Sequence, residues 1–145
     1  PSSTEQVAQP DRFTGAMPDG PTEVGLEMDE NVRIVLDDVL GFAETRVFLE
    51  ELAGAAAGIA ATGWDGDRWA LVDDGGVRGV VWAVVFDTEA SRDRFVSTLT
   101  PRLADLPERA TLGAMPVDGR PVAMLRIGVQ PDVRVTLEPQ PGAER

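Results

Sequence analysis

Apolar residues recur every three or four positions from Leu40 onward, which is the spacing of one buried face of an α-helix. The stripe consists of Phe42, Ala43, Val47, Leu49, Leu52 and Ala53. Gly54 interrupts the stripe, and the alanine-rich segment 55–61 predicts a second helix that ends at Gly63. The small side chains of this second helix would allow it to lie close to a neighbouring element.

The apolar period then shortens to that of β-strands. Trp69 and Leu71 precede the sequence Asp-Asp-Gly-Gly at 73–76, which is typical of the turn of a β-hairpin. The second strand of this hairpin contains an unbroken apolar run at 80–86. A run without alternation predicts a central strand that is covered on both faces.

A third helix is expected to begin after Thr88, which is a suitable N-cap residue, and to run to Thr100. Its apolar face would comprise Phe95, Leu99 and Leu103. Pro101 is compatible with the first turn of a helix, so it is expected to bend or restart this one. Pro107 would end the segment.

Three more strands are expected in the last third of the chain. Residues 110–115 and 122–127 would form two of them, joined through the Asp-Gly turn at 118–119. In the segment 133–138, apolar and polar residues alternate strictly, which predicts an edge strand with one exposed face. The elements together favour an α+β domain: a mainly antiparallel sheet of about four to five strands with two to three helices packed on it.

The chain divides into three parts by composition. Residues 1–31 contain several prolines and glycines and are expected to form a linker or docking segment, with a short N-terminal helix that Ser2 and Glu5 would cap. Residues 32–138 are expected to form the α+β domain, and residues 139–145 a flexible tail. The sequence does not begin with Met, so it is interpreted as a piece of a longer chain.

Composition excludes most side-chain chemistry. The 145 residues include no His, Cys, Lys or Tyr, so they offer no Ser-His-Asp triad, thiolate nucleophile, Schiff-base lysine, P-loop, or zinc site of nitrogen and sulfur ligands. The net charge of −12 makes nucleic acid and anionic membrane surfaces poor partners, and the longest apolar run is too short to span a bilayer. Strong acidity with arginine and without lysine suggests a salt-rich, halophilic source or one with a high GC content.

The densest group of candidate site residues is the segment 63–69, Gly-Trp-Asp-Gly-Asp-Arg-Trp. As a binding site, Asp65 and Asp67 would supply oxygen atoms to a hard cation, and Trp64 and Trp69 would form a stacking wall. However, two carboxylates fall short of the roughly six to eight oxygens that calcium takes. A structural interpretation of this segment is therefore favoured.

In the structural interpretation, Gly63 ends the preceding helix, residues 65–66 turn the chain, Arg68 pairs with a carboxylate, and both indoles fill the core. Other adjacent carboxylates, at 37–38 and 50–51, are expected to be solvated helix charges, and those at 73–74 to lie on an exposed hairpin tip. No catalytic residue, metal ligand or cofactor is assigned to this chain.

Three stretches together resemble a known group of proteins. They are Ser-Ser-Thr-Glu-Gln-Val at 2–7 before a proline, the segment 63–69, and Val-Val-Phe-Asp-Thr-Glu-Ala at 84–90 leading to Phe95. In this order they resemble the C-terminal region of secreted or lipid-anchored zinc metallopeptidase-like proteins of halophilic archaea and several bacterial groups. The resemblance spans roughly residues 1–130.

In these proteins a His-Glu-x-x-His helix lies upstream, so the resemblance implies zinc only for an upstream domain. Gln9 and Pro10 stand where the relatives usually carry His-Pro, and the absence of His means that no catalytic residue carries over. The resemblance therefore implies a non-catalytic accessory domain with an extracellular or cell-envelope location. The segment that docks on the peptidase-like domain would comprise Ser3, Thr4, Glu5 and Gln6.

Three functional interpretations remain open. The first is an accessory domain that packs on, or presents substrate to, an upstream peptidase domain. The second is a free-standing binding module for a peptide or protein, with a peptide strand added at the 133–137 edge. The third is an independent enzyme that uses Asp and Glu alone, as glycosidases do, which would need two carboxylates about 5–9.5 Å apart in a cleft.

Overall fold

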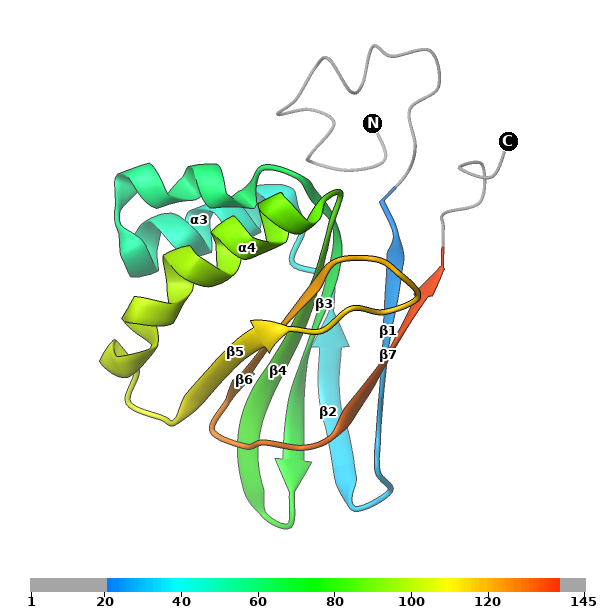
Figure 1. Cartoon of the computed structure of the whole chain (residues 1–145). Helices are drawn as coiled ribbons and strands as arrows, with labels where there is room; N and C mark the ends of the chain where they lie inside the picture. The colour runs from blue at the N-terminus through cyan, green and yellow to red at the C-terminus, as the bar shows by residue number, and fades with distance from the viewer. Residues whose placement is uncertain (1–20, 139–145) are drawn as a thin grey trace.

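The computed structural model describes residues 21–138, which form seven strands, two α-helices and two 3₁₀ helices (Figure 1). In chain order the elements are β1 (Glu23–Met28), β2 (Val32–Asp38), α3 (Phe42–Ala53), η1 (Ala55–Ala61), β3 (Trp64–Asp74), β4 (Val77–Phe86), α4 (Glu89–Leu99), η2 (Thr100–Asp105), β5 (Ala110–Ala114), β6 (Val122–Ile127) and β7 (Val133–Glu138). The N-terminal helix, the docking segment and the tail predicted for 139–145 lie outside the described residues.

The strands form two antiparallel sheets. Five of them pair in the order β2-β3-β4-β6-β5, and β1 pairs with β7 in a separate two-stranded ribbon. Figure 1 shows that α3 and α4 lie on one face of the five-stranded sheet and the ribbon lies on the other. The prediction of an α+β domain with a mainly antiparallel sheet is confirmed.

Strand β4 is the centre of the sheet and of the core. Its side chains alternate between the two faces, so Trp82, Val84 and Phe86 pack against the helices. Val81, Ala83 and Val85 face the ribbon. All six are buried, which confirms the expected central strand with both faces covered.

The predicted hairpin turn is also present. It joins β3 to β4 through two residues, Gly75 and Gly76, with φ values of 62° and 95°. Two successive positive φ values are typical of the turn whose twist matches a right-handed strand pair, and glycine adopts them without steric strain.

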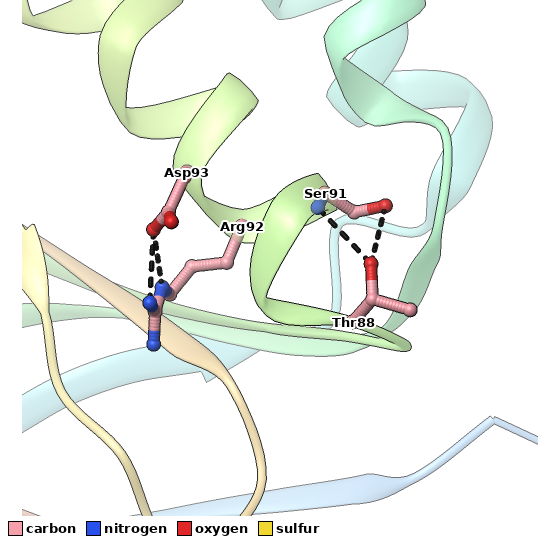
Figure 2. A network of polar contacts seen from close by, with 4 residues as sticks. All are labelled: Thr88, Ser91, Arg92 and Asp93. Carbon is pink, nitrogen blue, oxygen red and sulfur yellow. Dashed lines mark hydrogen bonds and ion pairs between the residues drawn. The ribbon is translucent and has the colours of Figure 1, made fainter.

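The third helix begins and ends as the sequence predicts. The backbone N–H of Ser91 donates to the Thr88 hydroxyl at 3.1 Å, so Thr88 is the N-cap of α4 (Figure 2). The helix gives way to the tighter η2 at Thr100, with Pro101 in its first turn. The alanine-rich segment after α3 is helical too, although it forms the 3₁₀ helix η1.

Two strands were not expected from the sequence. The linker prediction for residues 1–31 is wrong for β1, which pairs along its whole length with β7 and contributes the buried Val24. Strand β2 was missed because a β-bulge between Ile34 and Leu36 breaks the alternation of its apolar residues. The carboxylates at 37–38 therefore belong to a strand and not to a helix.

Candidate functional site

The segment 63–69, which the sequence singles out, lies at the start of β3. Trp64 is 2% exposed and packs in the core beneath the helices. The expected turn at Asp65 and Gly66 is wrong: both belong to β3, where a bulge shifts its register with β4. The bulge gives the strand an extra residue, which changes the direction of the side chains around it.

The Asp65 side chain holds Thr22, the residue immediately before β1, against the start of β3. Its carboxylate accepts a hydrogen bond from the Thr22 hydroxyl at 2.6 Å and forms an ion pair with Arg120. The Thr22 backbone N–H also donates to the Asp65 carbonyl at 2.6 Å. A Cβ atom on Gly66 would collide with the Thr22 carbonyl, so glycine allows this close approach.

Asp67 belongs to a different network, beneath the start of α3. It is 1% exposed, and its carboxylate accepts the backbone N–H groups of Leu40 and Gly41, each at 2.9 Å. The indole N–H of Trp82 donates to the same carboxylate at 2.8 Å. Asp67 therefore joins the segment before α3 to strands β3 and β4.

Burial raises the pKa of the Asp67 carboxyl above its usual value. The N–H donors of Gly41, Trp82 and Leu40 oppose this effect, because they stabilise the charged form. The Trp64 indole contributes the smallest lowering of the pKa, although its N–H makes no hydrogen bond of ordinary geometry to any described residue.

The two aspartates do not form one cation site. Asp67 contacts the residues before α3, on the helix side of the sheet, whereas Asp65 contacts Thr22 and Arg120, which lie towards the ribbon. Arg68 pairs with Asp37 of β2 at 2.8 Å, as the structural interpretation expects. Among residues 21–138, no group of three or more Asp or Glu residues is placed to hold a metal ion.

Trp69 differs from Trp64 in that it is only partly buried. It lies on the helix side of β3, directly opposite Trp82 in the register with β4. It lines a shallow pocket of about 160 Å³ together with Leu40, Phe48, Val80, Trp82, Leu125 and Ile127. We call this pocket the apolar groove, because every side chain that lines it is apolar or aromatic.

The apolar groove arises where the helix layer stops. Figure 1 shows α3 and α4 over one end of the sheet, while the β3–β4 hairpin extends beyond them. Phe48 of α3 meets the edge of the Trp82 ring at the boundary, with a centroid distance of 5.3 Å. Beyond the groove the same face continues to Leu71, which is partly buried, and to Leu36, which is 54% exposed.

The sequence analysis identified Trp69 but not the groove. The other lining residues come from the segment before α3, from α3, and from β4 and β6, so only the tertiary structure brings them together. The sequence signal was limited to Trp69 and Leu71, which share one face of the strand before the hairpin turn. Contiguous apolar surface marks interaction sites more often than scattered apolar residues do, and the groove is extended on the same face by Leu71 and by the exposed Leu36.

The larger pockets of the described region, unlike the groove, have charged side chains in their lining. One of about 420 Å³ lies between the ribbon and β2, where Glu23 and Glu138 are directly opposite each other. Asp37 and Arg68 also line it, but they neutralise each other in an ion pair. The three carboxylates are exposed, so this pocket lacks the desolvated acid that carboxylate catalysis needs.

Comparison with known proteins identifies a family without assigning an activity. Residues 30–138 match the family described as a domain of unknown function, DUF8575. The chain belongs to this family. No curated protein matches the chain, and no solved structure matches it.

The DUF8575 match includes every residue of the apolar groove and leaves out β1. Within the part of the chain that the structure describes, no helix is long and apolar enough to cross a membrane.

Proposed function

We propose that this DUF8575 domain is a non-catalytic binding module that takes up a polypeptide segment in the apolar groove. The observation that carries the proposal is the groove itself, which combines five partly exposed apolar side chains, Trp69 among them, with the buried Trp82 and Leu125 beneath them, on a protein of net charge −12. Removing such surface from water is favourable by roughly 25 cal/mol per Å². A partner with bulky apolar side chains would gain from this burial without any chemical step.

The geometry favours binding over catalysis in the described region. Asp67 is the one buried carboxylate there whose pKa departs clearly from its usual value, and three N–H donors occupy it. Asp65 is held by Thr22 and Arg120. Both acids stabilise the fold, which leaves neither in a position to transfer a proton to a bound substrate.

The accessory-domain form of this proposal follows from the sequence resemblance. There, the domain would belong to an envelope-associated zinc metallopeptidase-like protein, outside the cell or at its surface, and would pack on or present substrate to the upstream domain. In the structure, Glu23 and Glu138 are paired at one end of the ribbon, on the side of the sheet opposite the groove.

A selection from a displayed library of random peptides tests the binding function. The wild-type protein is compared with Val80→Asp, which places a charge in the groove, and with Val77→Asp as a matched control. Val77 lies on the same strand, is 56% exposed and does not line the groove. Thermal unfolding checks that each variant is folded. If Val80→Asp does not fold, Ile127→Ser replaces it as the groove variant.

We expect peptides to be enriched on the wild type and on Val77→Asp but not on Val80→Asp. Calorimetric titration with the synthesised peptides then measures the dissociation constants. No enrichment on the wild type, or equal enrichment on Val80→Asp, would overturn the proposal.

A peptidase assay on this chain and on a longer parent chain tests the accessory role separately from peptide binding. Hydrolysis by this chain alone, abolished by a chelator, would contradict a non-catalytic function.

A further inference from the structure

The charges around the apolar groove are unevenly placed. Glu44 and Glu51 lie on the surface of α3 at four residues before and three residues after Phe48, so they share the flank of the helix that faces the groove. Asp38 is opposite Trp69 in the register of β2 with β3. All three carboxylates are exposed.

None of these three carboxylates has an ion-pair partner among residues 21–138. Asp38 accepts only the neighbouring backbone N–H of Val39, at 2.7 Å. The arginine on α3 does not neutralise them, because Arg46 lies on the opposite flank and pairs with Glu50 at 3.2 Å. Within residues 21–138, the end of the groove next to α3 is therefore an acidic rim without a compensating arginine.

The far end of the groove, towards the β3–β4 hairpin, has a different charge balance. Asp73 lies between Arg33 and Arg78, at 3.7 Å and 3.8 Å. Asp74 is the next residue of the same hairpin, so two arginines and two aspartates leave this end without a net charge. A ligand that matches both ends would be basic where it meets α3 and neutral where it meets the hairpin.

From this asymmetry we infer that the occupant of the apolar groove is a segment of another polypeptide with bulky apolar side chains and an Arg- or Lys-bearing flank that lies against Asp38, Glu44 and Glu51. The inference rests on the proposed function and specifies the chemistry of its ligand. A second copy of this chain fits less well, because each copy has a net charge of −12 and would meet the other with like charge. Complementary charge fixes orientation and favours one class of partner over another.

The peptide selection supplies the first readout. Sequences enriched on the wild type should combine apolar residues with an excess of Arg and Lys over Asp and Glu on one side. Enriched sequences that are apolar without a charge bias would overturn the inference while leaving the proposed function standing. No groove-dependent enrichment at all would overturn both.

The second readout is a charge-removal comparison on one enriched peptide, measured by calorimetric titration at a single salt concentration. The rim variant combines Asp38→Asn, Glu44→Gln and Glu51→Gln. The control variant combines Asp29→Asn, Glu30→Gln and Asp132→Asn, three exposed carboxylates next to the ribbon. Both variants change the net charge by the same amount.

We expect the rim variant to bind about tenfold more weakly than the wild type and the control variant to change little, because three exposed charge pairs each contribute a fraction of the affinity. Equal weakening by both variants would show a general effect of net charge and overturn the inference. Sedimentation analysis tests whether a second copy of this chain occupies the groove. A wild-type dimer that Val80→Asp converts to a monomer would show this and would also overturn the inference.

Discussion

The two faces of the five-stranded sheet have similar apolar character but different cover. On the ribbon side, Ala70, Val72 and Val81 are fully buried, and Val129 closes over the hairpin end. On the helix side, the same strands are buried only up to Trp82, and Val80 is partly exposed. The difference teaches that a central strand can be buried on both faces along part of its length and still present a binding surface on the rest.

Side-chain size accompanies this difference. The ribbon side of the sheet uses Val, Ala and Met, which let a second pair of strands pack close to the first. The helix side uses Trp, Phe and Leu, which fill the space under α3 and α4 but extend beyond it. Of the two tryptophans of β3, Trp64 lies under the helices and Trp69 lies beyond the point where they end. The pair therefore provides the most direct test of the comparison.

The largest effect is expected at the covered end of the helix side. Trp64→Ala should lower the free energy of unfolding by about 3–5 kcal/mol, because it removes a large buried aromatic side chain. Trp69→Ala, at the uncovered end of the same strand, should cost about 1 kcal/mol, since a partly exposed ring has less contact to lose. Urea unfolding of both variants measures the two values.

Equal destabilisation by the two tryptophan variants would contradict the boundary that the structure places between them. Val77→Asp serves as the control, because Val77 is exposed on the ribbon side and surface changes alter stability little.

An intermediate effect is expected at Asp67, which ties α3 to the sheet. In Asp67→Asn, an amide group faces the backbone N–H groups of Leu40 and Gly41 and the indole of Trp82, so at least one donor loses its acceptor. Loss of a buried partner costs about 1–3 kcal/mol. Urea unfolding at neutral pH measures the change.

The same variant reports the direction of the Asp67 pKa shift. Because burial raises the pKa of Asp67 in the folded state, the folded protein binds this proton more tightly than the unfolded chain does. The wild type should therefore gain stability relative to Asp67→Asn as the pH falls from above the folded pKa to below the ordinary value of the unfolded chain. Subtracting the variant's profile removes the contributions of the other carboxylates. A difference that shrinks with falling pH would mean that the donors outweigh burial.

The smallest effect on stability per residue is expected from salt, because it acts on charges all over the protein. With 25 acidic and 13 basic residues, self-repulsion opposes folding, and ions at about 1 M shorten the screening length to roughly 3 Å. The melting temperature should rise from low to molar KCl. The melting temperature of the rim variant should rise less with KCl than that of the wild type. A melting temperature that does not change with KCl in either protein would remove the argument for a salt-rich source.

Local signals in the sequence determined much of the secondary structure. Periodicity located α3, the capping residue Thr88 located the start of α4, and adjacent glycines located the β3–β4 turn. These features depend on residues within a few positions of one another, so each can be read without knowing the rest of the fold. The unbroken apolar run of β4 likewise showed that both of its faces are covered.

The site depended on contacts between residues far apart in the chain. Asp65 and Asp67 are two positions apart, but a bulge in β3 and partners 43 and 26 residues away give them separate networks. Strand β1 was missed because its partner is β7, at the other end of the described chain.

The sequence by itself determined the elements from α3 onward, the central strand, the net negative charge and the lack of His, Cys and Lys chemistry. Only the tertiary structure decided that a ribbon covers one face of the sheet while the helices stop short on the other. The physical reason is that the burial of a side chain depends on which distant segments of the chain meet on its face of the sheet. Phe48, Trp69 and Ile127 became one groove because the sheet places β3, β4 and β6 side by side under the end of the helix layer.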